Sequence, residues 1–302
     1  MNSITIWLQQ LRIHHWLKNI IIFIPILIIA SSNYLNLATI YKLIIAFFAF
    51  SIAASFVYIL NDLIDIKFDK SHPTKSNRPL AAGIIPVSSG YIALFILGIV
   101  TLILFNFLNP NSYLLILTYL FLNIIYSMYL KKVLLLDCFV LSSFYTLRIV
   151  YGADVINVSL SFWLIAFSTF FFLSLAFAKR LSELQLAEVL SLKDNFGRSY
   201  TAKDIPFLSI FGISSGLISI LILALYINSP SIFSNFNYPY FIWIVVFAIL
   251  FWIAWIWLNV LRGDVDIDPI LFAVNDKISL IIAILILMMF LAGKSGNYYS
   301  LI

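Results

Sequence analysis

The chain consists mainly of apolar runs about 16–24 residues long, the length that a helix needs to cross the hydrocarbon core of a bilayer. Short polar segments separate these runs. The pattern predicts an all-α protein, a polytopic membrane bundle of about nine transmembrane helices. The predicted spans are residues 20–38, 40–60, 91–109, 112–130, 133–153, 160–178, 206–228, 239–261 and 278–293.

The first span has a second interpretation. Arg12 and Lys18 precede the apolar run 20–30, and two serines follow it, which is also the order of parts in a secretory signal peptide. The polar cluster at 14–19 is unusually specific for a leader that is removed, so a transmembrane span is favoured. No obvious repeat or low-complexity tract interrupts the chain, and residues 1–302 are predicted to form one integral-membrane domain.

The composition supports a membrane protein. Hydrophobic residues make up 63% of the chain and charged residues 10%, with a mean hydropathy of +1.06. A soluble domain carries about 25% charged residues to cover its surface, and a disordered chain needs low hydrophobicity, so both classes are excluded. The single cysteine, Cys138, excludes an internal disulfide. The net charge of +5 does not indicate nucleic-acid binding, because the basic residues are not massed in one arm.

The charged residues are sorted to one side of the predicted membrane. The N-terminus and the loops 61–90, 131–132, 179–205 and 262–277 hold 15 of the 18 basic residues. The positive-inside rule places this side, with the N-terminus, in the cytoplasm and the C-terminus outside. The same side holds 11 of the 13 acidic residues, a concentration that topology does not require. It predicts a polar chemical site at the cytoplasmic face of the cell membrane.

The clearest candidate for that site lies at the inner end of the second span, where the sequence reads NDxxDxxxD. The residues are Asn61, Asp62, Asp65 and Asp69. On a helix this spacing places the three carboxylates on one stripe, where they repel one another unless a cation neutralises them. Mg²⁺, which takes one or two carboxylates together with substrate phosphates, is the natural candidate. The alternative is a solvated helix end whose acids pair with Lys67 and Lys70.

The next segment adds basic residues to these acids. Lys75 and Arg78 follow the acidic stripe within a stretch that two prolines and Gly83 prevent from being helical. A metal-binding acidic stripe beside Lys and Arg is typical of a diphosphate site, in which the metal and the cations share the phosphate charge. His72, which precedes a proline in this stretch, is interpreted as a hydrogen-bonding residue.

Further polar residues lie at the inner ends of other spans. The candidates are Lys18, Asn19, Tyr126, Lys131, Asp137, Lys179, Arg180 and Glu183. Asp137 lies about one turn inside a span, and we expect Lys131 or Lys132 to be its partner. Arg148 and Asp154 are expected to form a structural pair. The alternating acids at 264, 266 and 268 resemble half of a calcium loop but lack the rest of that pattern.

The NDxxDxxxD motif at the end of the second predicted helix resembles that of the UbiA superfamily of intramembrane prenyltransferases. Within the superfamily the chain is similar to the decaprenyl-phosphate phosphoribosyltransferase branch, from about residue 11 to about residue 285. The segments that carry the likeness are residues 11–19, 61–79, 126–131, 136–137, 147–148, 179–184 and 266–276. The resemblance implies a helical bundle whose cavity opens to the cytoplasm and, laterally, to lipid.

The resemblance also implies a reaction. Mg²⁺ held by Asn61, Asp62 and Asp65 binds the diphosphate of phosphoribosyl pyrophosphate, and the phosphate of a polyprenyl phosphate lipid attacks. The resemblance implies catalytic roles for Asp62, Asp65 and Asp69. The substrate-binding residues that it implies are Lys18, Asn19, Lys75, Arg78, Tyr126, Lys131, Asp137, Lys179, Arg180 and Glu183. Aromatic prenyltransferases have a second acidic motif, roughly DxxxD, that this chain lacks between its sixth and seventh predicted spans.

Two other functions compete with this one. A prenyltransferase acting on an aromatic acceptor would use the same Mg²⁺ motif, and the missing second DxxxD argues against it. A transporter would place ionisable residues near the membrane midplane and show repeated halves with broken helices. Here the charges gather at one face and the motif at 61–79 has no second copy, so transport is not favoured.

Overall fold

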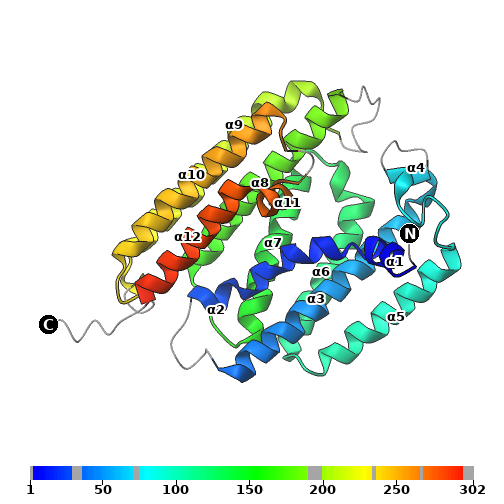
Figure 1. Ribbon diagram of the computed structural model, residues 1–302, viewed down its shortest axis with the longest axis horizontal. Coiled ribbons are helices and arrows are strands. Elements are labelled where there is room, and N and C mark those ends of the chain that lie inside the picture. The colour runs from blue at the N-terminus through cyan, green and yellow to red at the C-terminus, as the bar shows by residue number, and fades with distance from the viewer. Residues whose placement is uncertain are drawn as a thin grey trace. The chain divides into compact units, whose positions relative to one another are not determined.

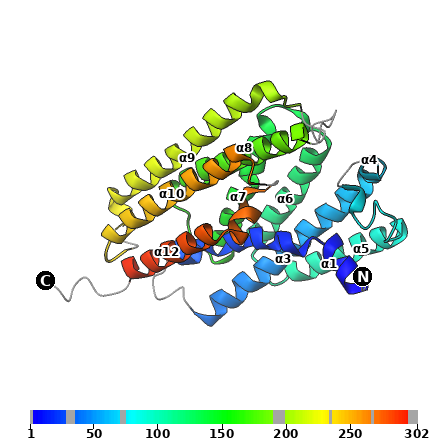
Figure 2. The same cartoon turned by 45° about the horizontal axis from the view of Figure 1, so that its top comes forward.

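The computed structural model describes residues 3–28, 36–70, 75–189, 199–232, 236–265 and 268–294. In these ranges the chain forms helices joined by turns and loops, with no strand (Figures 1 and 2). The prediction of an all-α protein is therefore confirmed.

Within the part of the chain that the structure describes, seven helices are long and apolar enough to span a membrane, and an eighth candidate is bent. The seven are α3 (Leu37–Ile64), α5 (Val87–Phe105), α6 (Pro110–Met128), α8 (Phe162–Val189), η4 with α9 (Ala202–Ile227), α10 (Tyr240–Arg262) and α12 (Lys277–Lys294). The bent candidate joins α1 (Ser3–Gln10) to η1 (Ile13–Phe23) and α2 (Ile24–Ile28) at an angle of 50°.

The predicted count of nine spans and the orientation of the two ends stay predictions. The first predicted span, 20–38, includes residues 29–35, which lie outside the described ranges. The fifth coincides with α7 (Leu136–Val155), which carries three charged residues and is not among the seven. Short helices complete the chain: α4 (Ile66–Lys70), η2 (Lys75–Asn77), η3 (Leu130–Lys132), η5 (Pro230–Ile232) and α11 (Pro269–Asn275).

The chain is divided between two compact units, each built from separate segments. Unit 1 comprises Met1–Ile24, Asn36–Met128 and Arg148–Val158, and unit 2 comprises Pro25–Leu35, Tyr129–Leu147 and Ser159–Ile302. Helix α7 therefore belongs to both, with its first half in unit 2 and its second half in unit 1. The single domain expected over 1–302 stays a prediction.

Helix α3 is the most buried helix of unit 1. In α3, 56% of the most apolar 18-residue stretch is buried. In α5, which packs beside α3, the corresponding share is 11%. The α3 residues Ala46, Ala49 and Ala53 are fully buried, and such small side chains let neighbouring helices approach closely. Phe95 and Leu102 on α5 are more than half exposed, which is expected of a surface in contact with lipid.

Helices α8, α9 and α10 of unit 2 lie side by side in both views (Figures 1 and 2). Their contact depends on Gly212 and Gly216, which are four residues apart on α9. A Cβ added to Gly212 would lie 2.2 Å from the Trp257 ring, and one added to Gly216 would lie 2.8 Å from Ile253. The pair is a small-xxx-small motif, which allows close packing where lipid gives helices little hydrophobic reason to associate.

Gly152, in the second half of α7, makes the closest such approach in unit 1. A Cβ added there would lie 2.0 Å from the backbone oxygen of Ile22 in η1. Because this oxygen belongs to the backbone, no side-chain rotation can relieve the clash.

We expect Gly152→Ala to lower the melting temperature of the detergent-purified protein. Gly98→Ala is the matched control, since its Cβ would meet nothing closer than 3.9 Å. Equal melting temperatures for the two variants would contradict this packing.

Candidate functional site

The acidic motif lies where α3 ends. The helix stops at Ile64, Asp65 caps it, and α4 begins at Ile66. The predicted stripe required one continuous helix, so the break at Asp65 changes how the three acids are arranged. The negative end of a helix dipole is an unfavourable place for a carboxylate, and cations must therefore supply the compensating charge.

Two arginines compensate Asp62. Its carboxylate is 3% exposed, and its Oδ1 accepts from Nη2 of Arg12 at 2.6 Å and from Nη1 of Arg78 at 2.9 Å. A buried carboxylate with a hydrogen-bonded guanidinium partner is far less costly than one without. Arg78 was expected near the acids, whereas sequence reasoning gave Arg12 no place in the site.

Arg78 also neutralises the second buried acid. Its Nη1 donates to Oδ2 of Asp69 at 2.6 Å, so one nitrogen bridges two carboxylates that are seven positions apart. Lys67 and Lys70 are exposed, and Asp62 and Asp69 contact arginines instead. The alternative of a solvated helix end paired with these lysines does not describe those two acids. The result is a cluster of two carboxylates and two guanidinium groups, Asp62, Asp69, Arg12 and Arg78, called here the charge quartet.

Arg12 reaches Asp62 from the bend between α1 and η1. Its φ and ψ of 52° and 48° lie in the left-handed region, which costs a non-glycine residue about 1–2 kcal/mol. The guanidinium also lies 4.9 Å from the centre of the Tyr58 ring on α3, a cation–π contact. These two contacts offset the backbone strain, which is retained where it delivers a cation to the acidic motif.

Gln10 holds the other oxygen of Asp62. It is 1% exposed, its Nε2 donates to Asp62 Oδ2 at 2.8 Å, and its Oε1 accepts from the backbone N–H of Leu80 at 3.3 Å. One buried side chain thus links α1, the acidic motif and the segment that carries Arg78. A lone glutamine at the end of an amphipathic turn gives no sequence signal of such a role.

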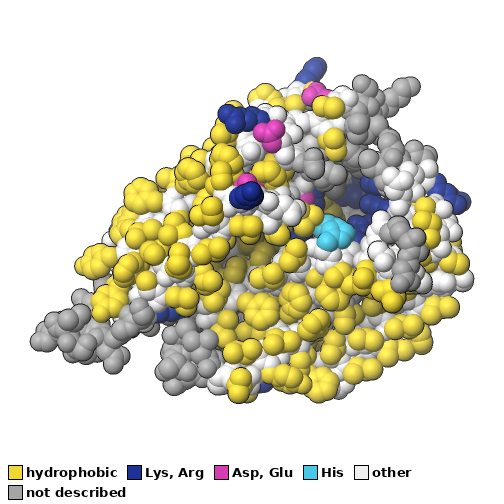
Figure 3. Space-filling view, viewed as in Figure 1, with side chains coloured by type: hydrophobic (Ala, Val, Ile, Leu, Met, Phe, Trp, Pro, Cys, Tyr) yellow, Lys and Arg dark blue, Asp and Glu magenta, His cyan; other side chains and the backbone are white. Residues whose placement is uncertain are grey.

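A polar pocket of about 250 Å³ is lined by three members of the charge quartet, Arg12, Asp62 and Arg78. Its lining residues are Gln9, Gln10, Arg12, His14, His15, Asp62, Asn77, Arg78 and Pro79. In Figure 3 a histidine side chain lies beside Lys and Arg side chains on a face otherwise covered mostly by hydrophobic side chains. The pocket presents both signs of charge, which suits a ligand that is itself an anion with a bound cation.

The donor chemistry of the motif fits a hard divalent cation. Asn61, Asp62 and Asp65 offer oxygen atoms only, on the last turn of α3 and its cap, and Mg²⁺ is commonly held by one or two carboxylates plus substrate phosphates. Within the described ranges, no group of three or more His, Cys, Asp or Glu residues is placed to enclose a metal. Asn61, Asp62 and Asp65 would thus supply only part of a coordination shell, and phosphate oxygens would have to complete it.

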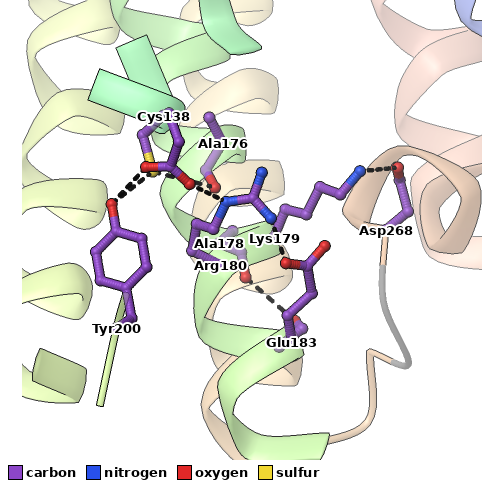
Figure 4. A network of polar contacts seen from close by, with 10 residues as sticks. Cys138, Ala176, Ala178, Lys179, Arg180, Glu183, Tyr200 and Asp268 are labelled. Carbon is purple, nitrogen blue, oxygen red and sulfur yellow. Dashed lines mark hydrogen bonds and ion pairs between the residues drawn. The ribbon is translucent and has the colours of Figure 1, made fainter. Parts of the chain in front are cut away.

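A second polar cluster lies within unit 2 (Figure 4). Nε of Arg180 forms an ion pair with Oδ2 of Asp137 at 2.5 Å, and its Nη1 bonds to Glu183 one turn along α8. The hydroxyl of Tyr200 donates to Oδ1 of Asp137 at 2.6 Å. The sequence predicts Lys131 or Lys132 as the partner of Asp137 and gives no sign of Arg180, which the packing of α7 and α8 brings to it from 43 positions away.

Lys179 and Arg180 are adjacent in sequence but differ in environment. Arg180 is 1% exposed, whereas the Lys179 side chain is 21% exposed and its Nζ donates to Oδ2 of Asp268 at 3.3 Å. Asp268 also caps α11 by accepting from the backbone N–H groups of its first turn. Arg180 is therefore enclosed by protein groups, and Lys179 is the cation of the pair that solvent reaches.

The remaining candidates are spread over both units. Asn19 is buried, donates to Ser51 and accepts from Nε of Arg148 at 2.8 Å. We expected Arg148 and Asp154 to pair with each other. Instead, Arg148 lies over the Phe50 and Tyr119 rings, and Asp154 accepts a hydrogen bond from Ser112.

The other candidates lie in different elements: Lys18 in η1, Lys75 in η2, Tyr126 in α6 and Lys131 in η3. His72 and Asp266 lie outside the described ranges.

Comparison with known proteins identifies relatives along most of the chain. The family model described as the UbiA prenyltransferase family matches residues 19–275. The uncharacterized protein y4nM of Sinorhizobium fredii is 37% identical over 93% of this chain, which spans 54% of that protein's length. The nodulation protein NoeC of Azorhizobium caulinodans is 31% identical over 90% of this chain and 88% of its own.

Two further comparisons are with a relative of named activity and with a solved structure. A decaprenyl-phosphate phosphoribosyltransferase of Mycobacterium tuberculosis is 34% identical over 60% of each chain. The solved structure of a UbiA homolog from Archaeoglobus fulgidus bound to DMAPP and Mg²⁺ superposes with a TM-score of 0.70 at 14% identity, covering 96% of this chain and 99% of that one. The superposition establishes the fold.

The two neighbouring cations of α8 give a direct test of the second cluster. We expect Arg180→Gln to destabilise the protein by about 3–5 kcal/mol, because it leaves Asp137 and Glu183 without their buried counter-ion. Lys179→Gln breaks a partly exposed pair and should cost about 0–1 kcal/mol. Chemical denaturation in detergent, followed by tryptophan fluorescence, measures both. Equal losses would mean that Arg180 is not held as described.

The adjacent glutamines of α1 test the link made by Gln10. We expect Gln10→Ala to speed amide hydrogen exchange in the segment 78–85, because the Leu80 N–H loses its acceptor and Asp62 loses a donor. Gln9→Ala is the matched control, since Gln9 is exposed. Exchange in this segment at the wild-type rate in Gln10→Ala would argue against the connection.

Proposed function

The chain belongs to the UbiA prenyltransferase family, and on that premise we propose that it transfers a 5-phosphoribosyl group from phosphoribosyl pyrophosphate to a polyprenyl phosphate. Family membership and the apolar helices make it a multi-pass membrane transferase. The particular donor and acceptor rest on the phosphoribosyltransferase relatives and on the site. We place the site at the cytoplasmic face of the cell membrane, on the side where the basic residues gather.

The observation that carries the proposal is the pocket lined by three members of the charge quartet. Two guanidinium groups, from Arg12 and Arg78, line it together with the carboxylate of Asp62. Guanidinium groups bind phosphate oxygens in a bidentate manner, and carboxylates hold the cation that a diphosphate brings with it. Lys75, at the start of η2, adds a third cation close in sequence to Arg78.

Mg²⁺ fits this site, where Asn61, Asp62 and Asp65 would hold it and where it supplies charge that stabilises pyrophosphate as a leaving group. In the reaction, the bond between C1 of the ribose and the diphosphate oxygen breaks, and its electron pair leaves with pyrophosphate. A phosphate oxygen of the lipid forms the new bond to C1. Arg12, Arg78 and Lys75 bind the departing diphosphate, and the acceptor is already an anion that needs no general base.

The other site candidates take two kinds of role in this proposal. Lys18, Asn19, Tyr126, Lys131 and Lys179 bind the lipid phosphate or the 5-phosphate of the donor. Arg180 is paired with both Asp137 and Glu183, which suits these three residues to positioning α7 and α8 and leaves no positive charge for a phosphate. Asp69 shares Arg78 with Asp62 and so holds that guanidinium at the pocket.

Prenyl transfer to an aromatic acceptor is the second candidate, because the family is named for prenyl transfer. That reaction would ionise a prenyl diphosphate with the same acidic motif. Where aromatic prenyltransferases have a second DxxxD, this chain has Lys179, Arg180 and Glu183, and two of these three are paired with each other. The absence of a second DxxxD from this loop of the sequence favours the phosphoribosyl donor.

The reaction is tested with purified full-length protein, Mg²⁺, phosphoribosyl pyrophosphate and a polyprenyl phosphate. We expect a phosphoribosylated lipid and an equal amount of pyrophosphate. Asp65→Asn should lower kcat by about 10²–10³, the loss typical when one group that stabilises transition-state charge is removed. Glu188→Gln, which removes an exposed acid from α8, should leave the rate unchanged. Prenyl transfer to 4-hydroxybenzoate without any phosphoribosylated lipid would establish the second candidate instead.

A further inference from the structure

We propose that Arg12 and Arg78 are exchangeable counter-ions. In the substrate-free protein they neutralise Asp62 and Asp69, and they transfer to the diphosphate when a divalent cation takes Asp62. The inference rests on the proposed function, because it assumes a diphosphate ligand with a divalent cation. It adds that the two ligands bind cooperatively and that the arginines compete with the metal for the same carboxylate oxygen.

The two oxygens of Asp62 have different surroundings. Oδ2 is held at 2.8 Å by Gln10, which is almost fully buried. Oδ1 bonds to both guanidinium groups, whose side chains are 20% exposed for Arg12 and 27% exposed for Arg78 and line the pocket. Gln10 can therefore keep the carboxylate in place while Oδ1 changes partner.

The arginines have donors to spare for a phosphate. Among the described residues, Arg78 reaches its two carboxylates through Nη1, and Arg12 reaches Asp62 through Nη2. A guanidinium carries five N–H donors in a rigid fork. A short movement of either fork toward the pocket would exchange a carboxylate oxygen for phosphate oxygens without removing the charge from the site.

The charge balance makes the exchange cooperative. The net charge of the charge quartet is zero. A divalent cation that binds alone is repelled by two guanidinium groups, and a diphosphate that binds alone is repelled by two carboxylates. When both bind, the metal neutralises the acids and the arginines neutralise the phosphates. Each ligand should therefore raise the affinity for the other by the same factor, as linkage requires.

A first measurement uses Mn²⁺, a spectroscopic probe for carboxylate sites of this kind, with no phosphate present. Full-length protein in detergent is titrated and bound Mn²⁺ is read by electron paramagnetic resonance. We expect Arg78→Gln and Arg12→Gln each to bind Mn²⁺ about tenfold more tightly than wild type, since a hydrogen bond between charged groups that competes for Asp62 is removed. Lys67→Gln, which removes an exposed cation beside the same motif, is the matched control for general electrostatics.

A reciprocal measurement uses inorganic pyrophosphate in the presence of a chelator. Asp62→Asn frees Arg12 and leaves Arg78 paired with Asp69 alone. It should tighten pyrophosphate binding about tenfold, measured by calorimetry. Glu188→Gln should leave it unchanged. A melting curve for each variant shows that it is folded at the temperature of the titration. If one of the two arginine variants is unfolded, the other serves for the comparison.

The outcomes separate this inference from the proposed function. Mn²⁺ affinity in both arginine variants equal to or below that of Lys67→Gln overturns the exchange, even if wild type forms phosphoribosylated lipid. Tighter Mn²⁺ binding in the arginine variants together with tighter pyrophosphate binding in Asp62→Asn supports it. If that pattern appears while phosphoribosyl pyrophosphate gives no product, the exchange stands and the proposed donor is wrong.

Discussion

The structure of the site depends on one electrostatic constraint, which is that a buried carboxylate at the carboxyl end of a helix must be neutralised. Asp62 meets this condition through Arg12 and Arg78, and each arginine then ties another segment to the end of α3. The left-handed backbone of Arg12 and the burial of Gln10 both follow from bringing donors to that single side chain. The pocket lies where these donors converge from two segments on the end of α3.

The cluster of unit 2 applies the same constraint with a different result. Arg180 lies between Asp137 and Glu183 and has almost no contact with solvent, so its charge is used up inside the protein. The arginines of unit 1 are partly exposed and face a pocket. Two sets of Arg–carboxylate pairs in one chain can thus have different roles, and exposure of the cation separates them.

Much of this could be read from the sequence, and the rest depends on contacts distant along the chain. The length of the apolar runs indicates membrane helices, and the spacing of Asp62, Asp65 and Asp69 indicates a cation site. The partners were harder, because Arg12 reaches Asp62 across 50 positions and Arg180 reaches Asp137 across 43. For Asp62 the sequence predicts Lys75 and Arg78 as neighbouring cations, and for Asp137 it predicts Lys131 or Lys132. Helix packing, which a single sequence does not show, adds Arg12 to the first and Arg180 to the second. The helix break at Asp65 also gave no proline or glycine signal.

The division of α7 between the two units has a consequence for biogenesis. Unit 1 is completed by residues 148–158, which leave the ribosome only after the segment 129–147 of unit 2 has been made. At about 5–20 residues per second, the helices that end at Met128 wait about 1–4 seconds for the start of their last segment. During that interval the carbonyl of Ile22 has no Gly152 to pack against. The packing of η1 against α7 can therefore form only after all the preceding helices of unit 1 have been synthesised.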